Sequence, residues 1–257
     1  MLIDSHCHLD RINLEPYQHD FANFMSAVNR AGIEHLLTIS IDLQSYPAML
    51  ALVEPYPQIS VSVGVHPNEN DTKEPTVDEL IELGKPDRVI AIGETGLDYF
   101  RSEGDSSWQQ QRFRDHITAA KQLKKPIIVH TREAKADTLR ILQEENAADV
   151  GGIIHCFTED WEFAQRALDL NFYISFSGIV TFNNAKTIKD TATKVPADRF
   201  LIETDSPYLA PVPHRGKPNY PLYVRYVAEH IAELRGTTFE DIADRSATNF
   251  KALFNLQ

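Results

Sequence analysis

The chain has little of what disulfide-rich or membrane-spanning proteins need. Only two of its 257 residues are cysteines, which excludes a disulfide framework and fits a reducing compartment. Its longest apolar runs are much shorter than the roughly 20 residues that cross a bilayer. No basic stretch followed by an apolar run stands near residue 1, so we expect no signal peptide and a cytoplasmic location.

Positive charge is scarce as well. The 25 Lys and Arg residues face 37 Asp and Glu residues, which gives a formal net charge of -12. A protein that coats nucleic acid needs clustered positive charge to displace counterions, so the balance argues against that class. It still allows a nucleic-acid end to bind at a local, metal-loaded site.

The sequence is rich in short apolar runs that alternate with helix-like segments. The runs occupy residues 2–6, 35–40, 59–65, 89–94, 126–131, 152–157, 172–178 and 200–205. Segments 106–125, 133–146 and 161–171 space their apolar residues as on one helix face. Hydrophobic strands that alternate with helices indicate a parallel sheet covered on both faces.

Eight such units in 257 residues predict an α/β fold of the (β/α)8 TIM-barrel type. We expect one domain over residues 1–257; a doubly wound open sheet is the alternative. The proline-rich stretch 206–221 is too long for a simple connector, so we expect it to form part of a site or a lid. Segment 239–256 is expected to be a closing helix.

The first strand runs into the motif DSHCHLD at residues 4–10. Residues i and i+2 of a strand point the same way, so His6 and His8 share a face while Cys7 points away. Two imidazoles about 6–7 Å apart on one strand can converge on a single ion. Taken alone, however, this pattern is more often a pair of surface or hydrogen-bonded histidines.

Several later strands also end in residues that bind metals, or are followed by one. These residues are His66, Glu94, His130, His155 and Asp205. In a parallel barrel these strand ends form one rim, where barrel enzymes carry their chemistry. Histidines and carboxylates together suit a borderline divalent metal, and they suit two ions about 3.5–4 Å apart bridged by a carboxylate and a water. A purely structural explanation would have to hold at five separate strands, so the metal-site interpretation is favoured.

The identity of the two divalent ions stays open among Zn, Mn, Ni, Fe and Mg. Neutral imidazole suits the first four better than Mg²⁺, which prefers oxygen ligands and retained waters.

The longer motifs resemble those of the TatD family of metal-dependent hydrolases and deoxyribonucleases, within the amidohydrolase-like type. The segments that carry the resemblance are DSHCHLD (4–10), GVHP (64–67), GETGLDY (93–99), KPIIVHTRE (125–133), HCFTED (155–160) and ETDSPYLAPVPHRGKPN (203–219). The resemblance extends to NFKALF at residues 249–254 and so covers nearly the whole chain.

The resemblance implies a distribution of the ligands between the two ions. His6, His8 and Asp205 would bind one ion, His130 and His155 would bind the other, and Glu94 would bridge both.

A water bridged by two ions becomes hydroxide near neutral pH, so no protein nucleophile is required. Asp205 is expected to orient this water or to accept its proton, and with Glu94 and His66 it makes up the expected catalytic set. The family places a histidine equivalent to His66 near the substrate, where it would give a hydrogen bond or a proton to the scissile group.

The leading hypothesis for function is a phosphodiesterase that acts on ester bonds, an exonuclease-like deoxyribonuclease. Its partner would be a DNA end or another phosphodiester bound locally, with no membrane and no obligate protein partner. Arg101, Arg132, Arg215 and Lys217 lie in loops after the fourth, fifth and eighth strands and are expected to contact phosphate.

Two other function classes are open. The first is a two-metal amide or ester hydrolase, such as an aminoacyl-tRNA deacylase, because a metal-bridged hydroxide attacks carbonyl and phosphorus centres alike. The second is a metal-storing or scaffold protein, which is disfavoured because a rim site beside a long loop suggests turnover. Tyr99, Phe100 and Tyr208 are further candidates for stacking on a base, although loop aromatics more often pack.

Overall fold

The computed structural model describes residues 1–70 and 73–256. Its eight strands follow one another in the sheet in chain order, from β1 to β8, and helices alternate with them. The strands are β1 (Leu2–Cys7), β2 (Ile33–Thr38), β3 (Ile59–Val63), β4 (Val89–Asp98), β5 (Ile127–Arg132), β6 (Gly152–Ile154), β7 (Phe172–Phe176) and β8 (Phe200–Ile202). This order is that of a (β/α)8 barrel, whereas a doubly wound sheet reverses its strand order part-way; the TIM-barrel prediction is confirmed.

Four of the helices occupy the segments that the sequence predicts, at residues 107–123, 135–144, 161–169 and 239–254. The helices are α1 (Phe21–Arg30), α2 (Tyr46–Val53), α3 (Val77–Gly84), α4 (Ser107–Leu123), α5 (Lys135–Glu144), α6 (Trp161–Asp169), α7 (Lys186–Lys194), α8 (Val224–Arg235) and α9 (Phe239–Phe254). Short 3-10 segments lie at η1 (Leu9–Arg11), η2 (Glu15–Tyr17), η3 (Ala147–Asp149), η4 (Gly178–Thr181) and η5 (Pro221–Tyr223). In the part of the chain that the structure describes, no helix combines the length and apolar character needed to cross a membrane.

The chain forms two compact units. Unit 1 comprises residues 1–38, 156–158 and 175–257, and unit 2 comprises residues 39–155 and 159–174. The expectation of one domain over residues 1–257 stays a prediction.

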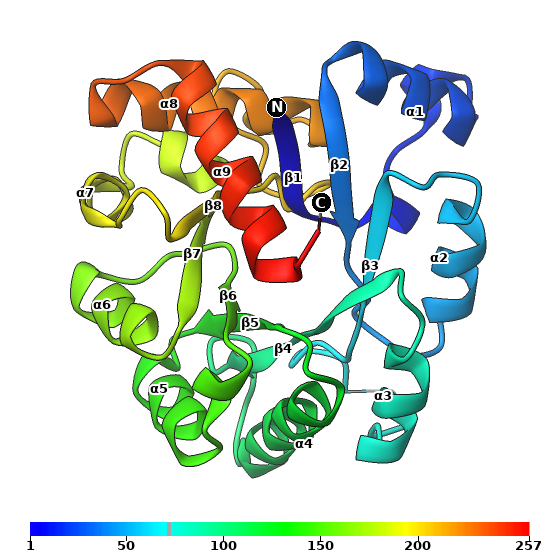
Figure 1. The fold of residues 1–257 in the computed structure, drawn as a ribbon, viewed down its shortest axis with the longest axis vertical. Helices are drawn as coiled ribbons and strands as arrows, with labels where there is room; N and C mark the ends of the chain where they lie inside the picture. The colour runs from blue at the N-terminus through cyan, green and yellow to red at the C-terminus, as the bar shows by residue number, and fades with distance from the viewer. Residues whose placement is uncertain (71–72, 257) are drawn as a thin grey trace. The chain divides into compact units, whose positions relative to one another are not determined.

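In unit 1, β1 is buried along its whole length and pairs in parallel with β2. The chain after β8 lies beside the end of β1, because the Asp205 N–H donates to the His6 carbonyl at 2.9 Å and Cys7 bridges Ser206. Helices α8 and α9 pack against each other (Figure 1). The contacts of Asp205 with His6 and of Ser206 with Cys7 bring the polar ends of the first and eighth strands together.

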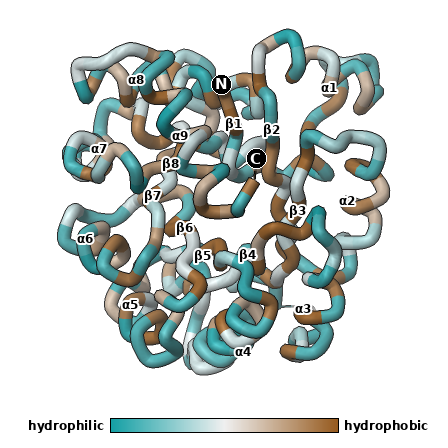
Figure 2. Tube along the Cα trace, viewed as in Figure 1, coloured by the Kyte–Doolittle hydropathy of each residue, from teal (hydrophilic) through white to brown (hydrophobic). Residues whose placement is uncertain are grey.

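In unit 2, the strands from β3 to β7 pair in parallel with their neighbours in sequence. Helix α4 packs against α3 and β4 (Figure 1). Figure 2 colours α4 mostly teal, yet the helix buries an apolar face with Phe113, Ile117 and Ala120, as the amphipathic pattern of segment 106–125 predicts.

Strand β4 approaches β5 closely near their C-terminal ends. Gly96 has a φ of 137°, and a Cβ at this position would lie 2.0 Å from the His130 carbonyl oxygen. Only glycine tolerates both this backbone conformation and this approach. Gly96 therefore lets the strand that carries Glu94 lie against the strand that carries His130.

Candidate metal centre

Unit 2 gathers three predicted site residues, all histidines, around the carboxylate of a fourth, Glu94. The Glu94 Oε1 atom lies 2.8 Å from His155 Nε2, 3.2 Å from His130 Nδ1 and 3.3 Å from His66 Nε2. We call these four residues the Glu94 cluster. The Glu94 side chain is buried, so the carboxylate contacts imidazoles in a place that water reaches little.

The electrostatics of the Glu94 cluster favour an ionised carboxylate. Burial alone would raise the pKa of Glu94, but His155, His66 and His130 together outweigh it and lower that pKa well below its usual range. Burial lowers the pKa of His66, partly offset by Glu94. The pKa of His130 is raised, because hydrogen bonds to Asp98 and Glu94 outweigh the effect of its burial.

Asp98, at the end of β4, supports this cluster through a side chain. Its Oδ2 atom lies 3.2 Å from His130 Nε2 and accepts a hydrogen bond from the Asn68 amide at 2.8 Å. Its Oδ1 atom accepts the Arg101 backbone N–H at 3.0 Å. Burial by itself would raise the pKa of Asp98. The hydrogen bonds have the larger effect and lower this pKa below its ordinary value, so Asp98 is ionised. An ionised Asp98 holds the proton of His130 on Nε2 and leaves Nδ1 as the ligand atom beside Glu94.

His66 also has a defined tautomer. Its Nδ1 atom accepts the Asn68 backbone N–H at 3.0 Å, so the proton of the neutral ring lies on Nε2. The sequence places His66 on the substrate side; the structure brings it into the Glu94 cluster as well. Its Nε2–H is therefore the group that can donate.

Unit 1 holds a second group of predicted ligands, the His6 cluster, formed by His6, His8 and Asp205. The Asp205 Oδ1 atom lies 3.3 Å from His8 Nε2 and 3.6 Å from His6 Nε2. The centroids of the two imidazole rings are 5.1 Å apart, closer than the roughly 6–7 Å expected along one strand, and His8 lies just after the last residue of β1. Asp205 adopts a φ of 56°, an uncommon conformation for a residue with a Cβ, and such conformations concentrate at functional sites.

Asp4 supports the His6 cluster through the backbone. The buried Asp4 carboxyl accepts the Thr204 N–H at 2.9 Å, the Thr204 hydroxyl at 2.6 Å and the His6 N–H at 3.3 Å. Burial raises the pKa of Asp4 to about 8. Because Thr204 precedes Asp205, Asp4 fixes the main chain at both strands that carry this cluster.

Cys7 points away from the His6 cluster, as strand alternation predicts. Its Sγ donates to the Leu37 carbonyl of β2 at 3.4 Å, and the side chain is fully buried. Burial raises the pKa of the thiol, so it is inert.

The two clusters fit divalent metal ions by their donor sets. One candidate ligand atom from each of His6, His8 and Asp205 lies within 4.8 Å of the others, and the same holds for His66, Glu94 and His130. Two imidazoles with one carboxylate suit a borderline divalent cation. In unit 2 the neutral His66 ring carries its proton on Nε2, so the imidazoles suited to a cation beside Glu94 are those of His130 and His155. The number and identity of such ions stay open.

The predicted phosphate-binding residues take different places. Arg101 lies three residues after the end of β4 and lines a pocket. Arg132 is the last residue of β5 and not a loop residue as predicted, and its guanidinium lies 3.9 Å from the centroid of the Phe100 ring. In unit 1, Arg215 lies over the Phe182 ring at 3.9 Å, and Lys217 is exposed in the same proline-rich stretch.

The aromatic candidates also differ from one another. The Tyr99 hydroxyl donates to Asp137 at 2.8 Å, so its ring packs rather than presenting a free edge. Phe100 is 55% exposed, and Tyr208 is 48% exposed and contacts His8 edge-on at 5.8 Å. The contact with His8 makes the proline-rich stretch part of the site in unit 1, as predicted.

Sequence reasoning did not single out Asp98 and Asp4 as supporting residues. A usable signal existed for Asp98, which lies four residues after Glu94 on the same strand and therefore on the same face. For Asp4, two residues before His6, the same alternation applies. Their partners could not be read from the sequence.

Comparison with known proteins identifies the family. The family model described as TatD related DNase matches residues 3–255. This chain belongs to the TatD family. It is 48% identical over 256 residues to the metal-dependent hydrolase YcfH of Escherichia coli (strain K12), covering 99% of this chain and 96% of that protein. It is 42% identical to the metal-dependent hydrolase YabD of Bacillus subtilis (strain 168), and each chain is covered completely.

The fold agrees with a solved TatD-family structure. The crystal structure of the TatD homologue YjjV from Escherichia coli K12 matches with a TM-score of 0.91 at 27% identity, covering 100% of this chain and 98% of that one. The resemblance to the TatD family is thus confirmed, and the chain is a TatD-type metal-dependent hydrolase.

Proposed function

We propose that this TatD-family hydrolase cleaves phosphodiester bonds and acts as an exonuclease-like deoxyribonuclease on a DNA end. The observation that carries the proposal is the position of Arg101. Its backbone N–H is held by Asp98, the carboxylate that also contacts His130 of the Glu94 cluster. A guanidinium on this fixed segment is suited to a phosphate oxygen next to the reacting group. The family model that the chain matches is also described as a DNase.

Each unit would hold an ion with the ligands that the sequence predicts. His6, His8 and Asp205 would hold an ion in unit 1, and Glu94, His130 and His155 would hold an ion in unit 2. Ions bound there would lower the pKa of water to near neutrality and polarise the phosphoryl oxygen. Bridging of two ions by Glu94 stays a prediction.

The protein's own groups have separate tasks in this proposal. Asp205 accepts the proton of the attacking water. His66 gives a hydrogen bond from Nε2 to the scissile group, a role for which its tautomer is set by the Asn68 N–H. Asp98 keeps His130 in the tautomer that leaves Nδ1 for a metal ion.

The test begins with elemental analysis of protein purified without added metal. The same preparation is then assayed, with Mn²⁺ or Mg²⁺ added, on single-stranded DNA, duplex ends, RNA, phosphodiester dyes, acyl-tRNA and amides. We expect bound transition metal and release of nucleotides from DNA ends. Failure to hydrolyse any phosphodiester at saturating metal would overturn the proposal, and turnover of acyl-tRNA or amides instead would establish the alternative.

A matched pair of variants ties the activity to the site. Arg101→Ala is expected to raise KM for DNA, because a phosphate contact is lost. Arg166→Ala on α6 removes a charge of the same kind from unit 2 outside the cluster and should leave KM unchanged. Equal KM values in both variants would remove Arg101 from the substrate site.

A further inference from the structure

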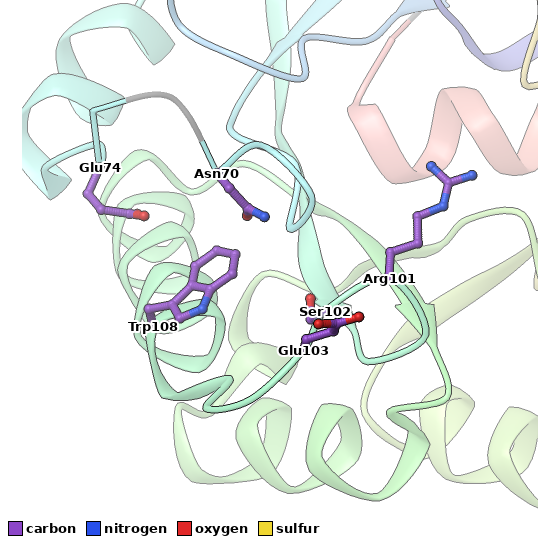
Figure 3. A pocket seen from close by; sticks show the side chains of 6 residues that line it. All are labelled: Asn70, Glu74, Arg101, Ser102, Glu103 and Trp108. Carbon is purple, nitrogen blue, oxygen red and sulfur yellow. The ribbon is translucent and has the colours of Figure 1, made fainter.

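A pocket of about 630 Å³ lies in unit 2 at the N-terminal end of α4 (Figure 3). It is lined by Asn70, Glu74, Arg101, Ser102, Glu103 and Trp108. Small-molecule sites in proteins usually have volumes of about 300–1,000 Å³, so this pocket can hold a ring system with polar substituents. None of the proposed catalytic roles uses the indole ring of Trp108.

The indole ring of Trp108 forms a rigid wall of this pocket. Figure 3 shows the ring between Glu74 and Ser102, facing Asn70. The Arg112 guanidinium lies 4.8 Å from the ring centroid and is almost completely buried. An aromatic ring backed by a fixed cation is a suitable platform for another flat ring.

Arg112 also connects this wall to the Glu94 cluster. It donates to the His66 carbonyl at 2.8 Å and to the Glu69 carbonyl at 3.0 Å, and it forms an ion pair with Glu74. The same side chain therefore fixes the Trp108 ring and the segment that carries His66.

On its other side, the pocket is joined to the cluster through Asp98. Arg101 and Ser102 belong to the segment after β4, where Asp98 accepts the Arg101 N–H. Gln109, the residue after Trp108, donates to Ser102 and accepts the Asp98 N–H at 2.9 Å. Both walls of the pocket thus depend on residues that contact the Glu94 cluster.

We propose that this pocket binds the nucleobase of the nucleotide whose phosphate lies at the Glu94 cluster, with the base stacked on Trp108. The inference rests on the proposed phosphodiesterase function and names a binding site for its substrate. An uncharged base is not repelled by Glu74 and Glu103, whereas a phosphate is, so the base enters at Trp108 and the phosphate faces Arg101. The Asn70 amide and the Ser102 hydroxyl can bond to the edge of a base. Stacking on an indole tolerates any base, as trimming of a DNA end requires.

The two tryptophans of the chain, Trp108 and Trp161, make a direct binding test possible. In the Trp161→Phe protein, all tryptophan fluorescence comes from Trp108. Deoxycytidine 5′-monophosphate, added in EDTA without metal, is expected to quench this fluorescence in a saturable way. Deoxyribose 5-phosphate, which has no base, is expected to leave it unchanged.

The reciprocal variant is the control. In Trp108→Phe the remaining signal comes from Trp161 on α6, and the nucleotide should leave it unchanged. Equal quenching by the nucleotide and the base-free sugar phosphate, or no quenching by either, would overturn the inference. Quenching of Trp161 to the same extent would show non-specific quenching and would overturn it too.

Kinetics provide a second measurement on the metal-loaded enzyme. Trp108→Ala is expected to raise KM for a dinucleotide by about tenfold or more, with Trp108→Phe retaining most of the binding. KM for a phosphodiester without a base should be the same in all three proteins. Equal KM values for the dinucleotide in wild type and Trp108→Ala would contradict the proposal.

The two proposals fail in distinguishable ways. The fluorescence test needs neither metal nor turnover. If quenching depends on the base but the protein hydrolyses no phosphodiester, the proposed base pocket stands and only the proposed phosphodiesterase function is overturned. If the protein hydrolyses phosphodiesters but its quenching does not depend on the base, the proposed function stands and the proposed base pocket is overturned.

Discussion

The two ligand clusters are built from the same residue types but are held in different ways. In unit 2, Asp98 contacts the side chain of a proposed ligand, with its Oδ2 atom 3.2 Å from His130 Nε2. In unit 1, Asp4 accepts hydrogen bonds from two main-chain N–H groups and from the Thr204 hydroxyl. The first arrangement sets the tautomer and orientation of an imidazole, and the second sets the course of two strands. A supporting carboxylate can therefore act on metal affinity or on stability, according to what it touches.

The two clusters also differ in charge. Burial with hydrogen-bond donors and imidazoles keeps Asp98 and Glu94 ionised, since their pKa values are lowered. Burial with few compensating charges raises the pKa of Asp4 to about 8. The unit 2 cluster thus concentrates negative charge where a cation would lie, while the carboxyl that supports the unit 1 cluster is largely neutral near pH 7.

The largest effect is expected from Glu94→Gln. The amide keeps the shape of the side chain but loses the charge that three imidazoles surround, so kcat should fall by at least about 10²-fold while the fold is retained. Steady-state kinetics, elemental analysis and circular dichroism measure these quantities. Glu162→Gln on the exposed surface of α6 is the control and should behave as wild type. Retained activity in Glu94→Gln would remove Glu94 from the catalytic set.

Gly96→Ala should break the unit 2 cluster through the backbone. Its Cβ would meet the His130 carbonyl oxygen at 2.0 Å in a left-handed region, so we expect a loss of about 3 kcal/mol or more in the free energy of unfolding. Gly104→Ala is the control that has backbone strain without a steric clash, because Gly104 has a φ of 78° and no atom lies within 4 Å of a Cβ at this position. It should lose only about 1 kcal/mol. Urea unfolding measures both, and equal losses would show that the close approach of β4 to β5 is unimportant.

Asp98→Asn tests whether support through a side chain controls metal affinity. An amide at this position no longer holds the His130 proton on Nε2 by charge, so metal affinity or activity should fall by about 10–100-fold. The urea midpoint should change little. Metal titration against a chelating dye measures the affinity. A variant with unchanged affinity and lowered stability would make Asp98 equivalent to Asp4 and abolish the contrast between the clusters.

Asp4→Ala should act mainly on stability. It leaves the Thr204 and His6 N–H groups without this acceptor, which should lower the free energy of unfolding by about 1–3 kcal/mol. Asp4→Asn keeps an acceptor and is the matched control, with a much smaller loss.

The same pair predicts a pH dependence with a definite sign. The folded pKa of Asp4, about 8, lies above its ordinary value of 3.8, so the folded state binds more protons between these values. The contribution of Asp4 to stability is therefore greatest below about pH 4 and is lost as the pH rises toward 8. Asp4→Asn should lack this decline in urea unfolding between pH 5 and 8. An identical decline in both proteins would contradict the raised pKa.

Cys7→Ser should have the smallest effect. The thiol points toward the Leu37 carbonyl and away from both neighbouring histidines, and a serine hydroxyl can donate to the same oxygen. Metal content and kcat should stay near wild type, with a stability change below about 1 kcal/mol. A loss of bound metal in this variant would show that residue alternation does not describe the end of β1.

The amino-acid sequence was enough to locate the eight strands and the polar residues near their C-terminal ends. The predicted ends themselves were wrong for β4 and β5, which continue past Glu94 and His130 to Asp98 and Arg132. Hydrophobic runs of strand length locate β1 to β8, and a period of two residues puts His6 and His8 together and Cys7 apart. These are local properties, because each depends on neighbours within a few residues along the chain.

The groups that support the ligands, and the place where a substrate can lie, follow from contacts between residues far apart in the sequence. Asp98 meets His130 across 32 residues, Asp4 meets Thr204 across 200, and Trp108 joins residues 70 and 74 in one pocket. Each contact depends on the register of the strands and on the path of the loops. The local pattern of polar and apolar residues encodes neither. The predicted basic residues Arg132 and Arg215 illustrate the same limit. Arg132 is the last residue of β5 and not a loop residue as predicted, and packing places both guanidinium groups on aromatic rings.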